Sequence, residues 1–190
     1  MLKGQFPLER FKAQKTPFYY YDMALLEKTL DKVNSIVGRL PDYKVHYAVK
    51  ANFNPVILKA IASSGLGADC VSGGEIRAAL EAGFPASGIV YAGVGKSDEE
   101  ILLGLRSGIS RFNVESEAEL DVIAALSESE GVVAPVSFRV NPDIGAHTHA
   151  NITTGLAENK FGINYEQLEG VIRKALSLIT YNSCDNSTFN

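Results

Sequence analysis

Residues 43–52 read Tyr-Lys-Val-His-Tyr-Ala-Val-Lys-Ala-Asn, and this stretch decides the fold. Val45, Tyr47 and Val49 alternate with Lys44, His46, Ala48 and Lys50, which is the period of a β-strand. Lys50 stands at the C-terminal end of this strand, before an Asn-Phe-Asn-Pro turn. In a β/α barrel the chemistry takes place at that end of the strands. Lys50 is therefore a candidate for Schiff-base chemistry with an aldehyde, and the alternative is a surface lysine that closes a strand.

Strand and helix patterns alternate outward from this stretch, at the spacing of one β/α unit. The predicted strands are Lys44–Ala51, Gly67–Val71, Ile89–Ala92, Ser110–Val114 and Val136–Val140. The predicted helices are Ala24–Arg39, Pro55–Ser64, Gly74–Ala82, Asp98–Ser107, Glu117–Ser129 and Tyr165–Leu178. This alternation predicts an α/β protein with a parallel sheet, either a closed barrel or a doubly wound sheet.

Glycine motifs weigh against the doubly wound sheet. No G-x-G-x-x-G follows the first strand. Gly95-Lys96-Ser97 resembles the end of a phosphate loop, but Val90 stands where that motif requires its first glycine. We therefore predict a parallel (β/α)8-type barrel that is incomplete, because such a barrel usually needs ~250 residues. About five to six strands are present, and Ser177–Tyr181 could begin the sixth.

Composition and charge exclude several classes of protein. The net charge of -4 argues against nucleic acid or an acidic membrane surface as a partner. No apolar stretch reaches membrane-spanning length, and no signal peptide is recognisable. Cys70 and Cys184 cannot build a disulfide framework, so we expect a reducing compartment and a cytoplasmic location.

Four motifs, in order and at matching spacing, resemble the N-terminal half of diaminopimelate decarboxylases. This family consists of pyridoxal-phosphate enzymes with an alanine-racemase-like barrel, shared with ornithine and arginine decarboxylases. The motifs are Tyr47–Asn52, Gly67–Glu75, Phe138–Pro142 and Thr154–Ile163. The stretch from His147 to Ile163 favours the diaminopimelate branch over the ornithine branch.

The resemblance implies roles for three residues. Lys50 matches the lysine that binds pyridoxal phosphate covalently and then acts as an acid or base. Asp69 matches an acid near that lysine, and its alternative role is to cap the helix that begins near Val71–Gly73. Arg139 matches an arginine near the cofactor ring, with a salt-bridged strand-end arginine as the alternative.

The segment Asp143–Lys160 is polar and long enough to form a lid over the site. His147 and His149 lack Cys, Asp or Glu partners at ligand spacing, so we predict no metal site. Lys160 closes the segment, and both a substrate role and a structural role are open for it.

The resemblance also implies a domain organisation and an activity. We expect residues 1–181 to form the N-terminal part of the cofactor-binding barrel and residues 182–190 an irregular polar tail, without the C-terminal β-domain that relatives have. The expected reaction converts meso-2,6-diaminopimelate to L-lysine and CO2, and the full-length family member is expected to be a homodimer. An open barrel exposes unpaired edges and has no recognisable phosphate anchor, so we expect this chain to be inactive alone.

Two alternatives stay open from the sequence. One is a decarboxylase for another basic amino acid, such as ornithine or arginine. The other is a non-catalytic barrel protein that binds pyridoxal phosphate.

Overall fold

The computed structural model describes residues 6–40, 42–141 and 161–182. Its centre is a sheet of five parallel strands that follow one another in chain order. The strands are β1 (His46–Ala48), β2 (Gly67–Cys70), β3 (Ile89–Tyr91), β4 (Arg111–Val114) and β5 (Val136–Phe138). After Arg139 the chain continues as β6 (Val140–Asn141), which pairs in parallel with β7 (Ile163–Asn164). The α/β class and the parallel sheet are therefore as the sequence predicts.

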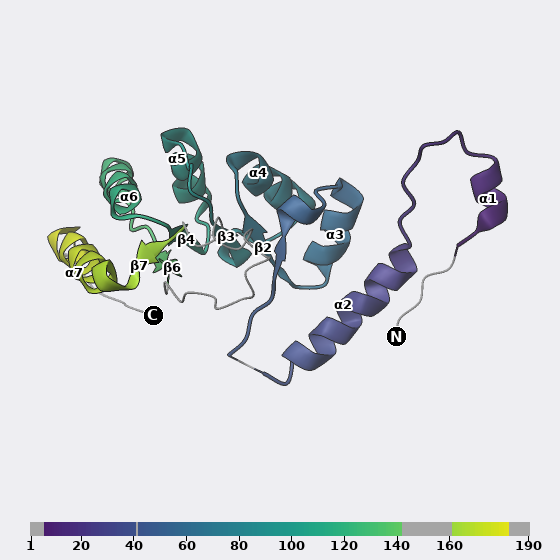
Figure 1. The fold of residues 1–190 in the computed structure, drawn as a ribbon, viewed down its shortest axis with the longest axis horizontal. Coiled ribbons are helices and arrows are strands. Elements are labelled where there is room, and N and C mark those ends of the chain that lie inside the picture. The colour runs from purple at the N-terminus through teal and green to yellow at the C-terminus, as the bar shows by residue number, and fades with distance from the viewer. Residues whose placement is uncertain (1–5, 41, 142–160, 183–190) are drawn as a thin grey trace, which may run out of the picture.

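Among the described residues, helices cover one face of this sheet and leave its other face open, so that the described part of the chain forms an arc (Figure 1). The covering helices are α3 (Pro55–Ser63), α4 (Gly73–Ala82), α5 (Asp98–Ser107), α6 (Glu117–Glu130) and α7 (Tyr165–Asn182). Alternate strand residues point to the two faces. On β2 the buried residues are Ala68 and Cys70, with Gly67 and Asp69 between them less buried. This alternation puts Asp69 on the open face.

Serine and glycine residues define the helix ends. The hydroxyls of Ser72, Ser97 and Ser116 accept hydrogen bonds from the backbone amides three residues ahead, at the starts of α4, α5 and α6. These caps direct each chain segment out of its strand and into the covering layer. The loops between each strand end and the next helix are consequently short, and the strand ends stay close together.

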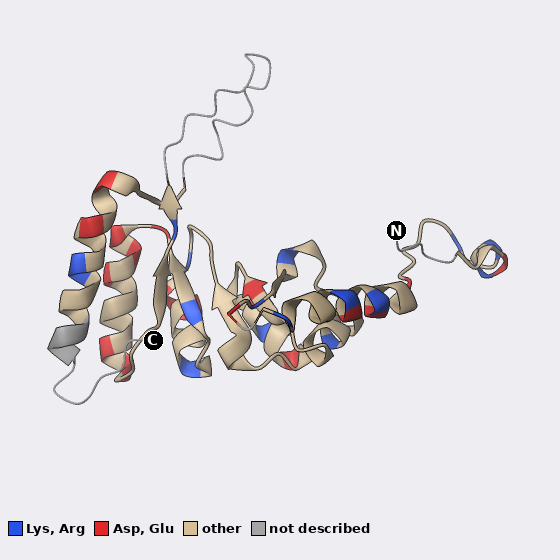
Figure 2. Ribbon diagram, turned by 90° about the horizontal axis from the view of Figure 1, so that it is seen from below, with Lys and Arg blue, Asp and Glu red and all other residues tan. Residues whose placement is uncertain are grey.

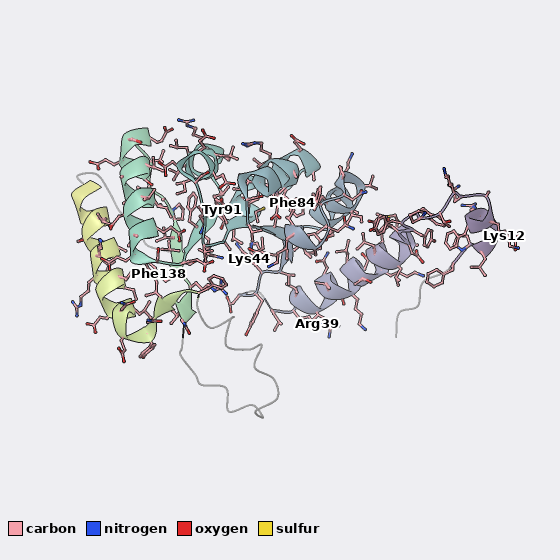
Figure 3. All side chains as sticks on the ribbon, turned by 45° about the horizontal axis from the view of Figure 1, so that its top comes forward. Lys12, Arg39, Lys44, Phe84, Tyr91 and Phe138 are labelled. Carbon is pink, nitrogen blue, oxygen red and sulfur yellow. The ribbon has the colours of Figure 1, made fainter. Side chains whose placement is uncertain are left out.

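Close packing joins α5 to β4. A Cβ atom at Gly104 of α5 would lie 2.8 Å from the Phe112 ring, which is fully buried. The absent side chain therefore lets the helix approach the strand at this point. Figure 3 shows Tyr91 and Phe84 within the main body, whereas Lys12 of α1 (Leu8–Lys12) belongs to a projecting N-terminal segment. Helix α2 (Met23–Val37) connects this segment to the body (Figure 1).

Three predicted elements differ from the structure. The strand predicted over Val136–Val140 is divided, because β5 ends at Phe138 and Val140 begins β6, which pairs in a separate sheet. The strand predicted over Lys44–Ala51 is confined to His46–Ala48, and Val49–Ala51 forms the 3-10 helix η1. Ser177–Tyr181 does not begin a strand, because α7 continues to Asn182. The amphipathic pattern of α7 extends through Leu178, so the periodicity that predicts the helix also explains its length. Of the tail predicted over residues 182–190, Asn182 is the last residue of α7 and the rest lies outside the described residues, so the domain limits stay a prediction.

Helices α6 and α7 lie side by side at the end of the arc (Figures 1 and 2). The Lys174 ammonium of α7 lies 2.8 Å from a Glu117 oxygen and 2.7 Å from an Asp121 oxygen of α6. These pairs are exposed, so they contribute little to stability. None of the helices in the described part of the chain has the length and apolar character that a membrane crossing requires.

Candidate functional site

A pocket of about 560 Å3 lies where the strands of the main sheet end. Its polar lining consists of Lys50, Asp69, Asn113, Glu115, Ser137 and Arg139. Its apolar lining consists of Val71, Ala92, Gly93, Val94, Phe138 and Phe161. Except for Phe161, which lies just before β7, these residues come from the carboxyl ends of β1 to β5 or from the turns that follow them. This is the edge at which β/α barrels place their active sites. The volume suits a small organic ligand.

Lys50 reaches the pocket from the turn η1 that directly follows β1. Its neighbour Val49 is completely buried and anchors this turn in the core. The Asn52 amide donates to the Val49 carbonyl at 3.2 Å, and the Tyr47 hydroxyl donates to the Asn52 carbonyl at 3.1 Å. The backbone that carries Lys50 is therefore held on both sides, and the residue lines the pocket.

Asp69 lies on β2 opposite Ala48 of β1, close to Lys50 in the same pocket. Burial raises the pKa of the Asp69 carboxyl, and the charges of Lys50 and His46 partly oppose this rise. Asp69 does not serve as the cap of α4, because the cap is Ser72, whose hydroxyl accepts from the Glu75 amide at 3.2 Å. The capping alternative for Asp69 is thus wrong. Glu75 lies in the first turn of α4 and accepts from the Val71 amide at 2.8 Å.

Arg139 lies between β5 and β6 and also lines the pocket. It follows the last strand of the main sheet, β5, whereas Lys50 follows the first strand, β1. One guanidinium nitrogen lies 3.0 Å and 3.2 Å from the two carboxylate oxygens of Glu115. The guanidinium also lies 5.6 Å from the centre of the Phe161 ring, a cation–π distance. Arg139 is therefore both a salt-bridged strand-end residue and a pocket residue.

Sequence reasoning brought Lys50, Asp69 and Arg139 to attention, and all three line this one pocket. It missed Glu115 and Phe161. The signal for Glu115 was present, because this acid directly follows the predicted strand Ser110–Val114 at the end where polar residues gather. Phe161 lies within the motif Thr154–Ile163, but no strand-end signal assigned it to the pocket. Its position depends on the pairing of β7 with β6, which periodicity does not predict.

Three further sequence candidates, His147, His149 and Lys160, lie outside the described residues. The same holds for the whole segment Asp143–Lys160, in which a lid was predicted, and for Cys184. Their roles stay predictions.

The donors of the pocket fit pyridoxal phosphate. Lys50 offers an amine for its aldehyde, and Asp69, on the adjacent strand, is an acid that favours a protonated nitrogen nearby. Arg139 supplies a second cation, and Val71, Ala92 and Phe161 supply apolar surface for a flat ring. Two cations and two carboxylates thus line one cavity of suitable size.

A family model confirms this assignment of the cofactor. Residues 26–180 match the model described as pyridoxal-dependent decarboxylase, pyridoxal binding domain. The chain is 60% identical over 177 residues to a diaminopimelate decarboxylase of Bacteroides thetaiotaomicron, covering 93% of this chain and 46% of that protein. It is 44% identical over 163 residues to a diaminopimelate decarboxylase of Vibrio cholerae, covering 86% and 39%.

Solved structures give the same match. A diaminopimelate decarboxylase from M. jannaschii, in complex with L-lysine, superposes with a TM-score of 0.80 at 35% identity, over 90% of this chain and 41% of that one. The arginine decarboxylase of the Paramecium bursaria Chlorella virus superposes with a TM-score of 0.64 at 24% identity, over 81% and 39%, and shares the fold. The chain spans less than half the length of these relatives.

Proposed function

The chain belongs to the pyridoxal-dependent decarboxylase family, and on this premise we propose that it forms the cofactor-binding part of a diaminopimelate decarboxylase. This lyase would release CO2 from meso-2,6-diaminopimelate and leave L-lysine. The observation that carries the proposal is that Lys50, Asp69 and Arg139, from three different strand ends, line one pocket. Identity of 60% to a diaminopimelate decarboxylase supports the choice of substrate over ornithine or arginine.

Lys50 is proposed to hold the cofactor through its Nζ atom, which would bind the aldehyde carbon. When bound, pyridoxal phosphate supplies an electron sink for the charge left on carbon as CO2 departs. Lys50 would stay close to the reacting atoms, where its Nζ could hold and return a proton.

Asp69 and Arg139 are proposed to set the charge around Lys50. The Asp69 carboxylate lies on the neighbouring strand and would stabilise a proton on the nitrogen that it faces. The Arg139 guanidinium would orient an anionic group of cofactor or substrate. Asn113 and Ser137, whose side chains bond to one another at 2.5 Å, would complete the polar floor between these charges.

Two further properties belong to this proposal. We propose a homodimer for the protein extended to the length of its relatives, and a cytoplasmic location in keeping with its cysteine usage. Sedimentation of the extended protein tests the first property, and fractionation of the source cells tests the second.

Borohydride trapping tests the cofactor role of Lys50. The chain is incubated with pyridoxal phosphate, reduced with borohydride and digested, and the tagged lysines are mapped by mass spectrometry. We expect the tag at Lys50 at the lowest cofactor concentrations. The control Lys44→Arg should keep the tag, whereas Lys50→Arg should lose it. A dominant tag on another lysine of the wild-type chain would contradict the proposal.

The substrate is tested separately, with the chain extended by the C-terminal part that its relatives possess. CO2 release is measured from diaminopimelate, ornithine and arginine side by side. We expect turnover of diaminopimelate, and a preference for either of the other two would reassign the substrate.

A further inference from the structure

We propose that Glu115 is a positioning residue that holds both the Arg139 guanidinium and the Gly93 turn at the edge of the cofactor pocket. The proposal rests on the proposed function, because it concerns the same pocket. Neither the family match nor the relatives assign a role to this residue. Its evidence is a set of hydrogen bonds that connects three consecutive β/α units.

Glu115 has a buried carboxylate that accepts hydrogen bonds from Arg139 and Gly93. Its side chain is only 3% exposed, although it directly follows a strand end that lines a cavity. Its Oε2 atom lies 3.0 Å from an Arg139 nitrogen, and its Oε1 atom accepts from the Gly93 amide at 3.1 Å. A buried charge persists only where such donors compensate its desolvation.

Gly93 is the second residue that Glu115 holds. Its φ of 118° is a conformation that residues with a Cβ rarely adopt, so the turn after β3 depends on glycine here. Its amide donates to Glu115, and its carbonyl accepts from the Lys96 ammonium at 2.7 Å. Charged side chains thus bind both polar groups of this residue. The turn forms part of the pocket lining, so its shape sets the shape of the cavity.

Lys96 stabilises the Gly93 turn and the backbone near Glu115 through buried polar contacts. Its side chain is fully shielded from solvent, and its ammonium donates to the Asn113 carbonyl at 2.9 Å and to Glu119. Glu119 in turn accepts from the backbone amide of Glu115 at 2.8 Å. The backbone that carries Glu115 is therefore fixed by the same ion pair that fixes the Gly93 carbonyl.

Arg139 depends on Glu115 more than Glu115 depends on Arg139. The arginine side chain is 50% exposed, and the ion pair with Glu115 and the Phe161 ring are the contacts that keep it at the pocket. Without the carboxylate, hydration and side-chain entropy favour a guanidinium that extends into water. The pocket would then lose the position of one cation and the shape of one turn.

The test uses Glu115→Gln, with Glu117→Gln as the matched control. Both changes remove one negative charge at the start of α6, but Glu117 is exposed and pairs only with the exposed Lys174 among the contacts described. Each protein is titrated with pyridoxal phosphate, and borohydride trapping at Lys50 gives the half-saturating concentration. We expect Glu115→Gln to raise this concentration about tenfold, the effect of losing a hydrogen bond to a charged group. Glu117→Gln should leave it unchanged.

A second readout reports on the Gly93 turn without any cofactor. Hydrogen exchange of the Gly93 amide, followed by mass spectrometry or NMR, should become faster in Glu115→Gln and stay the same in Glu117→Gln. The Arg139→Gln background separates the two actions of Glu115. In that background, adding Glu115→Gln should accelerate Gly93 exchange as before. The half-saturating cofactor concentration should change by less than it does in the protein that keeps Arg139.

The outcomes distinguish this inference from the proposed function. Normal trapping at Lys50 together with wild-type behaviour of Glu115→Gln in both readouts would overturn the inference and leave the function standing. If wild-type Lys50 is not trapped, the proposed function fails, and Gly93 exchange still decides whether Glu115 holds the turn.

If Glu115→Gln does not fold, Glu115→Asp replaces it in both experiments. That variant keeps the charge but withdraws it by one methylene, and we expect a partial change in each readout.

Discussion

The ammonium of Lys96 pairs with the carboxylate of Glu119 at 2.5 Å, and the lysine side chain has no exposure to solvent. Two backbone carbonyls, of Gly93 and Asn113, accept its remaining protons at 2.7 Å and 2.9 Å. All three donors of the ammonium are therefore satisfied. This compensation explains why a lysine can be buried beneath the pocket.

Replacing Lys96 by Met should destabilise the protein strongly. The methionine fills a similar volume but leaves Glu119 without its cation and two carbonyls without a donor. We expect the free energy of unfolding to fall by about 3–5 kcal/mol, the usual cost of breaking a buried pair. Urea unfolding followed by circular dichroism measures this change.

Lys174→Met is the control for Lys96→Met. Lys174 pairs with two carboxylates, whereas Lys96 pairs with one, but the Lys174 side chain is 32% exposed. The expected loss is below about 1 kcal/mol. Equal losses in the two variants would show that the Lys96 network does not stabilise the fold.

Gly104→Ala should strain the contact between α5 and β4. The new Cβ would lie 2.8 Å from the Phe112 ring and 3.0 Å from an Ile109 methyl, and both of these residues are buried. We expect an overpacking cost of about 1–3 kcal/mol, which exceeds the gain of about 0.5–1 kcal/mol from replacing a helical glycine. Thermal unfolding measures the net loss.

Gly170→Ala is the matched control, because Gly170 also lies within a helix, α7, and no atom of the neighbouring described residues lies within 4 Å of the position of its missing Cβ. This variant should gain about 0.5–1 kcal/mol. The packing argument is refuted if Gly104→Ala is as stable as Gly170→Ala.

Asp69 should influence the titration of His46. Burial lowers the pKa of His46, as do the charges of Arg111 and Lys44, whereas the negative charge of Asp69 raises it. Asp69→Asn removes the raising contribution, so the pKa of His46 should fall further. NMR titration of the His46 ring protons in both proteins measures the difference. An unchanged or higher midpoint in the variant would contradict the interaction.

Asp69 should also make stability depend on pH in an unusual direction for a carboxyl group. Its pKa is raised in the folded state, chiefly by burial, so the folded state binds its proton more tightly than the unfolded state does. This contribution to stability is complete below the unfolded-state pKa of about 3.9 and is lost as the pH rises through the folded-state pKa. At neutral pH the buried charge therefore costs stability.

Asp69→Asn removes that cost, because asparagine does not ionise. Relative to wild type, the variant should be more stable at about pH 7 than at about pH 3, where Asp69 is protonated in both states. Urea unfolding of both proteins at the two pH values measures how far the gain in free energy of unfolding at about pH 7 exceeds that at about pH 3. A stability difference that is independent of pH would refute the assignment. The proposed function explains why the chain carries the cost, since the carboxylate faces Lys50.

Much of the fold follows from local sequence alone. Alternation of apolar residues predicts four of the strands of the main sheet closely, and Ser72, Ser97 and Gly83 mark helix ends through hydrogen bonds that span only a few residues. The exception is the region of Lys50. There the apolar alternation continues to Val49, but the strand ends at Ala48 and Val49 begins the 3-10 helix η1. The Val49 side chain is completely buried in the core. Periodicity does not report such a turn.

The candidate site divides in the same way. Sequence by itself determined that Lys50, Asp69 and Arg139 stand at strand ends, since the parallel order of the strands brings their carboxyl ends to one edge. Only the tertiary structure decided which partners they meet. Glu115 and Arg139 are far apart in the chain and pair because β4 and β5 are adjacent in register, and Lys96 becomes buried because α6 presents Glu119 to it. Residue spacing cannot encode these contacts, because they depend on how one β/α unit packs against the next.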